Sequence, residues 1–454
     1  MTPSATLRRA LLTTLLSLLL SLLPGAILAA VSDQQAAELG RSLTPLGAER
    51  AANADGTIPA WDGGLGPNGD RYADPYADEQ PLFTITAANA QQHADKLSPG
   101  QLAMFKRYPN SFRMPVYPSH RTAAYPERVY ELARWNATHA ELSHDGNGVA
   151  NFREVYPFPI PQNALEVIWN HLTHYRGQGL ERTYIQVAVQ SDGDFTPVKL
   201  NEKVTWPAHL ADSPDPEKID NLMSLFIQRV LAPARLTGDV LLIHEPLNQV
   251  RQPRQAWLYN TGQRRVRRAP QIAYDAPGTA SDGLRTTDNL DLFNGAPDRY
   301  DWSLVGKREL YIPYNSFRLA DRTLKYGEIL NKGHLNPDHT RYELHRVWQV
   351  EATLKAGERH VYRKRVFFVD EDSWQIAIAD HYDGRGELWR VAEAHAFPFR
   401  DAQVPWFAAE ALYDLQSGRY LVSGLTNEEG QGYDFTPRYN YRDFTPQAIR
   451  RLGH

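Results

Sequence analysis

The 454-residue chain contains no cysteine and no excess of basic residues. Without cysteine it cannot form disulfides, thiolate metal sites or iron–sulfur clusters, and it has neither a cysteine nucleophile nor a lipidated cysteine. Its 49 Lys and Arg against 53 Asp and Glu give a formal net charge of −4. No overall positive field therefore exists to hold a nucleic acid. With 42% hydrophobic and 22% charged residues, the chain is too apolar to be disordered.

Long apolar runs are also scarce, and the clearest one lies at the N-terminus. Arg8 and Arg9 precede a Leu-rich run over residues 10–23, and small residues follow up to Ala29 and Ala30. This pattern predicts a secretory signal peptide over residues 1–30, cleaved after Ala29 or Ala30. The alternative is a membrane anchor, but the run of roughly 14 residues is shorter than the ~20 that a spanning helix needs.

Removal of the signal peptide leaves 47 Lys and Arg against 53 Asp and Glu, a net charge of −6. An exported chain without disulfides that is rich in Trp and Tyr fits a bacterial periplasm better than an animal extracellular space. No linker forces a boundary within residues 31–454, so we predict a single α+β domain. Its part up to about residue 180 is rich in helix and turn signals, and residues 181–454 are rich in strand signals.

Helix signals dominate the first part. Ser32 with Gln35 forms a capping-box pattern, and Ser98 with Pro99 forms a second helix start. The predicted helices cover residues 32–39, a segment from 98 onward, 125–140, 163–174 and 215–230.

Strand signals dominate from residue 183 onward, where the apolar period changes to two. Residues 342–354 are the best case, with one apolar set and one polar set that predict a buried face and a solvated face. Short turns at 370–373 and 383–386 imply antiparallel neighbours, and therefore a large curved antiparallel sheet. The other predicted strands are 183–189, 240–245, 256–259, 309–312, 363–369, 374–379, 387–394 and 420–425.

Several segments resemble a proteobacterial family known as domain of unknown function 1329, and together they span nearly the whole mature chain. They are TPLGAE at 44–49, NADGTIPAW at 53–61, DPYADE at 74–79, SHRTAAYP at 119–126, SGRYLV at 417–422 and TNEE at 426–429.

More distantly, residues 257–268, 300–306 and 342–394 resemble the half-barrel of periplasmic lipoprotein-sorting proteins of the localisation-factor type. This resemblance implies an incomplete β-barrel with helices packed on or in its concave face, around an apolar cavity that carries acyl chains. Members of the 1329 family are often encoded beside transporters of the resistance-nodulation-division type. The partners implied are a lipid or other hydrophobic molecule, such an inner-membrane exporter, and outer-membrane proteins.

Sequence motifs give no support for catalysis. Residues 64–69 match G-x-G-x-x-G but lack the preceding strand and following helix of a dinucleotide site. No H-E-x-x-H, G-x-S-x-G or Ser-x-x-Lys motif occurs, so we predict no catalytic residue, metal site or cofactor. His171 and His174 are interpreted as ordinary surface or hydrogen-bonded histidines, and Asp370 and Asp372 as a solvated turn.

Two sets of residues are candidates for ligand binding. Arg265 and Arg267 belong to an arginine run that either protects a sheet edge or engages phosphate or carboxylate headgroups at a cavity mouth. The second set comprises strand aromatics and one isoleucine that form either packed core or the lining of a ligand cavity. It consists of Trp348, Phe367, Trp374, Ile376, Trp389 and Trp406.

The leading hypothesis is a non-catalytic periplasmic carrier or chaperone for a lipid-like ligand. An acyl chain of ~14 methylenes loses ~11 kcal/mol of favourable burial in water, so a carrier must offer it an apolar groove. The first alternative is an envelope hydrolase that acts on an ester or a glycan. The second is an accessory subunit that docks onto an export complex and holds no ligand.

Overall fold

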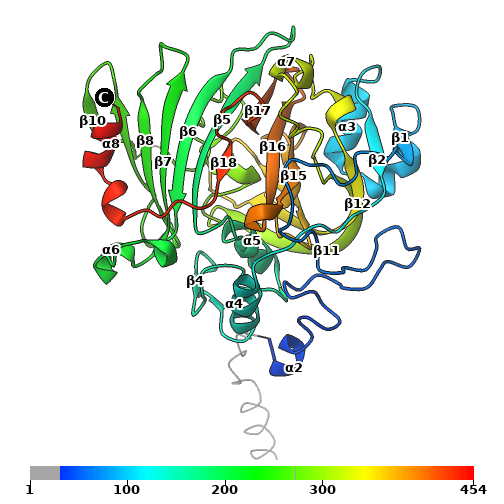
Figure 1. Ribbon diagram of the computed structural model, residues 1–454, viewed down its shortest axis with the longest axis horizontal. Coiled ribbons are helices and arrows are strands. Elements are labelled where there is room, and N and C mark those ends of the chain that lie inside the picture. Colours follow the sequence, from blue (N-terminus) through cyan, green and yellow to red (C-terminus); the bar gives the residue numbers. More distant parts are fainter. Residues whose placement is uncertain (1–30, 271, 454) are drawn as a thin grey trace, which may run out of the picture.

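The computed structural model describes residues 31–270 and 272–453, so the predicted signal peptide lies outside the described residues. One sheet of sixteen strands dominates the described part and curves around a central core (Figure 1). All its strand pairs are antiparallel except β2 with β12. The two ends of the sheet, β1 and β10, do not pair with each other, so the barrel is incomplete. The predicted α+β half-barrel is confirmed.

The strands follow one another across the sheet in the order β1-β2-β12-β13-β14-β15-β16-β17-β5-β6-β7-β8-β9-β10, with β11 beside β12 and β18 beside β5. A separate hairpin joins β3 and β4. The bounds are β1 Phe83–Ile85, β2 Met114–Tyr117, β3 Glu141–Leu142, β4 Val149–Ala150, β5 Gly179–Val189, β6 Val198–Thr205, β7 Leu222–Ala232, β8 Val240–Pro246, β9 Gln255–Asn260, β10 Arg265–Arg268, β11 Tyr300–Pro313, β12 Tyr342–Leu354, β13 Lys364–Asp370, β14 Ile376–Tyr382, β15 Leu388–Phe399, β16 Val404–Asp414, β17 Tyr420–Leu425 and β18 Tyr433–Asp434.

The helices are short. The α-helices are α2 Asp33–Ala36, α3 Pro99–Arg107, α4 Glu127–Ala137, α5 Ala164–Leu172, α6 Pro216–Ile219, α7 Tyr326–Ile329 and α8 Pro446–Leu452. The 3-10 helices are η2 Ala90–Lys96, η3 Pro207–His209, η4 Thr287–Leu292, η5 Pro337–His339, η6 Arg400–Ala402 and η7 Tyr441–Asp443. Among the described residues, no helix is both long and apolar enough to cross a membrane.

Helix α5 fills part of the concave side of the sheet. The Asn163 side chain caps its first turn, and its mostly apolar sequence buries Ile168, Trp169 and Leu172 in the largest core cluster. The same cluster contains Phe367 and Leu412, from strands β13 and β16. Because a nine-residue helix cannot cover so broad a sheet, part of the concave side is left for loops and open space.

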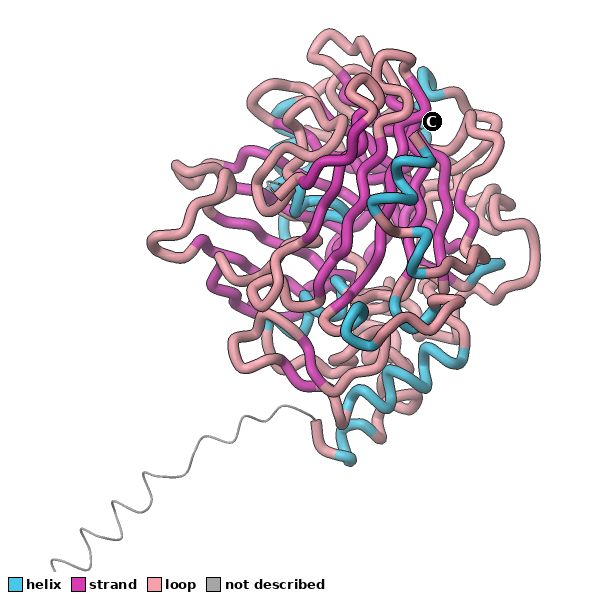
Figure 2. Tube along the Cα trace, turned by 90° about the vertical axis from the view of Figure 1, so that its left-hand side faces the viewer, coloured by secondary structure: helices cyan, strands magenta, loops and turns pink. Residues whose placement is uncertain are grey.

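The opposite face of the sheet is also covered. Helix α3 begins at the predicted Ser98 cap, with the reciprocal Gln101 bond of a capping box, and packs against β14 and β15. At the other end of the sheet, α8 packs on β8, β9 and β10 and buries Ile449 among apolar side chains of β7 and β8 (Figures 1 and 2).

The prediction of a helix over residues 215–230 is wrong. Only α6 forms there, and residues 222–232 are strand β7. Leu225 faces the cluster under α8, whereas Ser224 and Phe226 face the concave side. Because β7 is covered on both faces, its residues do not alternate between apolar and polar, and a short apolar run of this kind resembles a helix.

The prediction of a solvated face for residues 342–354 is also wrong in the first half of β12. Glu343 and His345, from the predicted polar set, are 0% and 1% exposed. The segment before α4 covers them, since the Ser119 hydroxyl donates to the Leu344 carbonyl and the His120 amide donates to Glu343.

Candidate ligand-binding cleft

Two adjoining recesses open on the concave side, between the sheet, the end of α5 and the loop at 290–294. The sheet recess has a cavity volume of about 80 Å³ and the loop recess about 170 Å³. Leu172, Arg176, Trp206 and Met223 line both recesses, so we describe them together as the cleft.

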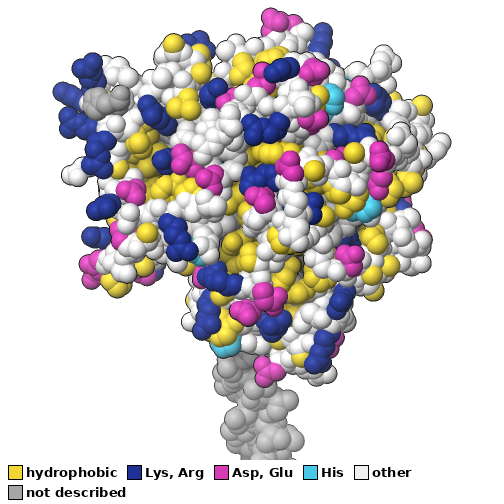
Figure 3. Space-filling model, viewed as in Figure 1, with side chains coloured by type: hydrophobic (Ala, Val, Ile, Leu, Met, Phe, Trp, Pro, Cys, Tyr) yellow, Lys and Arg dark blue, Asp and Glu magenta, His cyan; other side chains and the backbone are white. Residues whose placement is uncertain are grey.

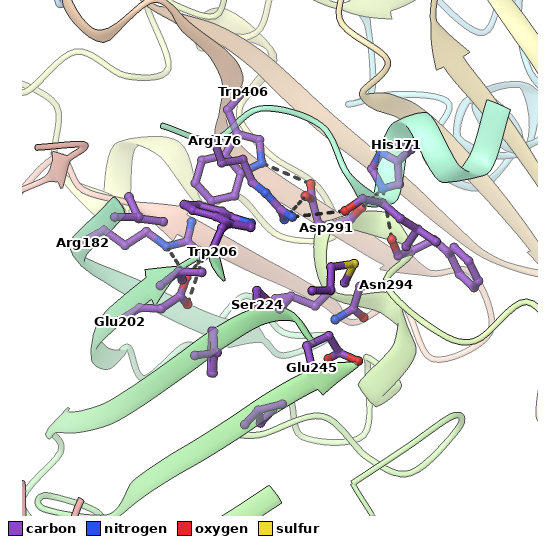
Figure 4. A pocket seen from close by; sticks show the side chains of 18 of the residues that line it. His171, Arg176, Arg182, Glu202, Trp206, Ser224, Glu245, Asp291, Asn294 and Trp406 are labelled. Carbon is purple, nitrogen blue, oxygen red and sulfur yellow. Dashed lines mark hydrogen bonds and ion pairs between the residues drawn. The ribbon is translucent and has the colours of Figure 1, made fainter. Parts of the chain in front are cut away.

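Seven parts of the fold supply the walls of the sheet recess. They are the strands β5, β6, β7, β8 and β16 and the segments around α5 and η4 (Figure 4). Its apolar lining consists of Leu172, Leu180, Val204, Trp206, Met223, Phe226, Ile243, Leu290, Phe293, Trp406 and Phe407. The loop recess is lined by Phe152, Val155, Leu222 and Leu247 in addition to the shared residues. Most of the cleft surface is therefore apolar.

Charged side chains also reach the sheet recess, and each positive group faces a negative one. Arg182 of β5 holds Glu202 of β6 at 2.9 Å, with both side chains nearly fully buried. Arg176 contacts Asp291 at 3.1 Å. Glu245 of β8 is held by Arg254 at 2.7 Å. These three pairs leave the sheet recess without net charge.

His171, at the end of α5, fixes the loop that carries Asp291. Its Nδ1 accepts the Ile376 amide at 3.2 Å, so its Nε2 carries the proton and donates to the carbonyls of Asp291 at 2.9 Å and Phe293 at 3.1 Å. Burial lowers the pKa of His171, which is therefore neutral. The loop needs this support because Asp291 and Leu292 have φ values of 55° and 61°.

Asp291 is the centre of the polar groups under the sheet recess. Its Oδ1 accepts hydrogen bonds from the Gln375 amide at 3.0 Å and the Trp406 indole at 3.2 Å. Burial acts to raise the pKa of the Asp291 carboxyl. The Arg176 guanidinium and the Gln375 amide that donates to Asp291 lower that pKa by more, so Asp291 is ionised.

Glu410 of β16 is the neutral partner in this group. One of its oxygens accepts the Leu292 amide at 3.0 Å, and the other is buried without a hydrogen-bond partner. Burial, and then the negative charge of Asp291, raise the pKa of Glu410 to about 8. We call Arg176, Asp291, Glu410 and the two histidines His171 and His174 the cleft cluster.

Several buried polar atoms around the cleft lack a partner in the described part of the chain. Arg176 Nε is an unused donor, and Asn294 Oδ1 is an unused acceptor. Both residues line the sheet recess. In the loop recess, His174 Nε2 makes no hydrogen bond and lies 3.5 Å from Asp291 Oδ2, and burial lowers the pKa of this histidine to about 3. Buried polar groups normally find partners, so these atoms indicate positions where a ligand or water can bind.

A second polar cluster lies away from the cleft, in the turn that the sequence predicted to be solvated. That prediction is wrong, since Asp370, Glu371 and Asp372 are 1–5% exposed. Arg121 donates to both oxygens of Asp372 at 2.7 and 2.8 Å. Glu371 contacts Lys307 at 2.9 Å. We call these five residues the anchor cluster, because they fasten the segment before α4 to the β13–β14 turn.

The anchor cluster brings Asp370 and Asp372 near His345, with ligand atoms within 4.8 Å of one another. Each carboxylate already accepts protein hydrogen bonds. Asp370 accepts from the Ser373 amide and hydroxyl, and Asp372 accepts from Arg121. This saturated network accounts for the grouping without a metal ion.

The predicted ligand-lining residues lie mostly outside the cleft. Phe367, Trp374 and Ile376 are fully buried in the main core cluster, and Trp348 is partly buried against it. Trp389 is half-buried, and its indole donates to Asp414 at 3.0 Å. None of these five lines either recess, whereas Trp406 lines the sheet recess.

Arg265 and Arg267 lie on β10, the last strand of the sheet order, with exposed side chains. They line neither recess, so the structure does not place them with the cleft. The sequence analysis missed Arg176, Trp206, Met223, Asp291 and Asn294. Arg182 was detectable, since it falls in the inward set of β5 with Leu180 and Tyr184, where a charged residue is unusual.

Comparison with known proteins gives one relative of high similarity. The uncharacterized protein PA3922 of Pseudomonas aeruginosa is 60% identical over 442 residues, which cover 96% of this chain and 97% of that protein. Among solved structures, one similar domain from Vibrio parahaemolyticus bears a provisional designation as an outer membrane lipoprotein-sorting protein. It is 14% identical with a TM-score of 0.44, and the match covers 63% of this chain and 98% of that domain.

A second solved structure, the LolA superfamily protein NE2245 from Nitrosomonas europaea, is 12% identical with a TM-score of 0.38. That match covers 63% of this chain and 98% of that protein. Neither structure is similar enough to bear on ligand or function. The family resemblance in the sequence is confirmed, since the family model described as protein of unknown function (DUF1329) matches residues 84–450. The chain belongs to the DUF1329 family.

Proposed function

We propose that this protein is a non-catalytic periplasmic carrier of a hydrophobic molecule that bears an uncharged polar group. The single observation that carries the proposal is the cleft, an apolar hollow on the concave side of the sheet with unused polar atoms in its walls. Ligand pockets typically enclose ~300–1,000 Å³. The two recesses enclose about 80 and 170 Å³, so a ligand would fill them and continue out through their open mouths.

The apolar walls favour a lipid-like body. Each methylene that leaves water for such a surface contributes about 0.8 kcal/mol. Trp206 and Met223 line both recesses. One extended apolar chain can therefore contact the first recess and then the second. The flexible Met223 side chain adapts to irregular apolar ligands.

The balanced charges of the sheet recess favour an uncharged polar group. A carboxylate or ammonium group would lose its hydration there without meeting an unpaired opposite charge, which is costly. A ligand hydroxyl group can accept from Arg176 Nε or donate to Asn294 Oδ1, two atoms of this recess without a hydrogen-bond partner. We therefore propose a hydroxylated neutral amphiphile as the ligand class.

The decisive experiment is native mass spectrometry of protein released from its own periplasm, followed by titration with two probes. Monomyristoylglycerol and myristate share one acyl chain but differ in headgroup charge. We expect a co-purifying hydrophobic ligand, and tighter binding of monomyristoylglycerol than of myristate. A clean apo mass with no binding of either probe would refute the carrier. Turnover of ester or glycan panels by such apo protein would favour a hydrolase, and stable capture of an exporter would favour an accessory subunit.

A filling variant tests whether the cleft is the binding site. Met223→Trp places a bulkier side chain where the recesses adjoin, and we expect monomyristoylglycerol affinity to fall by at least tenfold. Leu82→Trp adds similar bulk at a residue that is 64% exposed and serves as the matched control. Equal affinity in both variants would place the ligand elsewhere.

A further inference from the structure

Exposed arginines gather at one edge of the sheet. Figure 3 shows Lys and Arg side chains concentrated where Figure 1 places α8 and β10. We call this surface the basic edge, and it consists of Arg264, Arg265, Arg267, Arg268, Arg450 and Arg451. Within the described residues, none of the six lies within 4 Å of an Asp or Glu carboxylate, although many other arginines of the chain are paired.

The two elements that carry the basic edge pack directly against each other. Val266 packs into the cluster that contains Ile449 of α8, so Arg264 and Arg268 share the α8 side of the strand. Arg265 and Arg267 point to the other side. The arginines therefore surround the strand edge instead of lining one face.

The surroundings do not neutralise this charge. Asp239 lies beside the turn between β9 and β10, where its carboxylate accepts from the Asn260 and Thr261 amides. The chain as a whole is acidic, with a net charge of −4, so the basic edge is a local departure from the overall charge. Strand β10 also has no neighbour on its outer side, which leaves the arginines free to approach a partner.

The shape of the basic edge fits an extended anionic surface. Its six guanidinium groups are spread over two elements, and none of them lines either recess of the cleft. A flat array of phosphates satisfies such a spread, because guanidinium binds phosphate through paired hydrogen bonds. Apolar groups accompany the charge: Leu258, opposite Arg267, is 37% exposed, and the Arg268 guanidinium lies 5.7 Å from the Trp257 ring centroid. Basic residues beside an exposed Leu and a half-buried Trp are typical of surfaces that contact a bilayer interface.

We propose that the basic edge is a docking surface for an anionic lipid bilayer. It would hold the protein at the membrane through headgroup phosphates, while the cleft remains free to exchange its ligand. Each basic residue near an anionic membrane surface contributes roughly fivefold in affinity, so six arginines suffice for reversible binding. Docking of this kind is separate from ligand binding and does not depend on the proposed carrier function.

Co-sedimentation of the mature chain with vesicles tests the proposal. We expect binding to vesicles that contain phosphatidylglycerol, no binding to pure phosphatidylcholine vesicles, and release at high salt. Arg265→Glu with Arg267→Glu should lower the affinity by at least roughly thirtyfold, and Arg450→Glu with Arg451→Glu should do the same. The control reverses two exposed arginines elsewhere, Arg41→Glu with Arg134→Glu, and should change the affinity much less.

Three results would overturn the proposal. They are no binding of the unaltered chain to phosphatidylglycerol vesicles, undiminished binding by both basic-edge variants, and an equal loss in the control. If the unaltered chain does not bind phosphatidylglycerol vesicles, an acidic protein becomes the partner to test for the basic edge. Met223→Trp should bind vesicles normally, so failure of the cleft and failure of the basic edge are distinguishable. Circular dichroism of each variant verifies that it is folded.

Discussion

The anchor cluster and the cleft cluster are both buried groups of charged side chains, but only one of them is complete. In the anchor cluster, Arg121, Glu371 and Asp372 have every polar atom engaged within the protein. In the cleft cluster, Arg176 Nε and one oxygen of Glu410 have no hydrogen-bond partner among the described residues. A saturated cluster is sufficient as a structural fastening, whereas an unsaturated cluster beside a hollow is typical of a binding site. Burial of charge alone does not distinguish the two.

The largest effect should come from the anchor cluster. Arg121→Ala leaves Asp372 buried without its cation, and such a loss costs about 3–5 kcal/mol of the free energy of unfolding. Arg113→Ala is the control, because its pair with Asp338 is 40% and 63% exposed and should contribute less than about 1 kcal/mol. Urea unfolding measures both. Equal losses would show that the anchor cluster does not fasten the fold.

The matched substitution in the cleft cluster should lower the free energy of unfolding less than Arg121→Ala does, and it should weaken ligand binding. Arg176→Met leaves Asp291 with its Gln375 and Trp406 donors, so we expect a loss of only about 1–2 kcal/mol in unfolding free energy. Monomyristoylglycerol affinity should fall about tenfold, because the unused Nε donor is removed. The comparison between the clusters fails if Arg176→Met unfolds the protein as Arg121→Ala does, or if it leaves probe affinity unchanged.

The smallest effect concerns pH. Glu410 has its pKa raised to about 8 in the folded state, so the folded protein binds this proton more tightly than the unfolded chain. The stabilisation is fully present below the unfolded pKa of about 4.3 and is lost as pH rises through about 8. The unfolding free energy of the parent protein should fall by about 1 kcal/mol between pH 7 and pH 8 because Glu410 ionises. Glu410→Gln should not show this part of the fall.

The pH test needs a control because other buried groups also titrate. Glu131→Gln, at an exposed position of α4, should leave the pH slope of the unfolding free energy unchanged. Histidines with a lowered pKa, such as His174, contribute equally to the pH slope of the unfolding free energy in the parent and in both variants. Their contribution therefore cancels when the slopes are compared. An unchanged slope in Glu410→Gln would mean that Glu410 is already ionised at neutral pH.

The sequence predicts the parts of the fold that local patterns determine. Residues 342–354 largely alternate between apolar and polar side chains, and β12 has those bounds. The Ser98 cap marks α3 correctly because capping is a contact between neighbours in sequence. Strand β7 is missed because both its faces are covered, so its pattern contains no period of two.

The cleft is much harder to predict, because its walls come from separate elements across the sheet. Arg182 and Glu202 have an ordinary appearance in sequence, and only the pairing of β5 with β6 brings them together. Phe367 and Trp374 have the composition of a lining, but they pack in the core since α5 and β12 cover them. Whether an aromatic side chain meets protein or open space depends on long-range packing.

The anchor cluster joins Arg121 to Asp372 across 251 positions of the chain. The segment before α4 is synthesised first, so its partner in the anchor cluster is missing until the β13–β14 turn has also been made. A contact between residues so far apart in the sequence forms late in folding. We expect this segment to stay open to proteases and to aggregation until that contact forms.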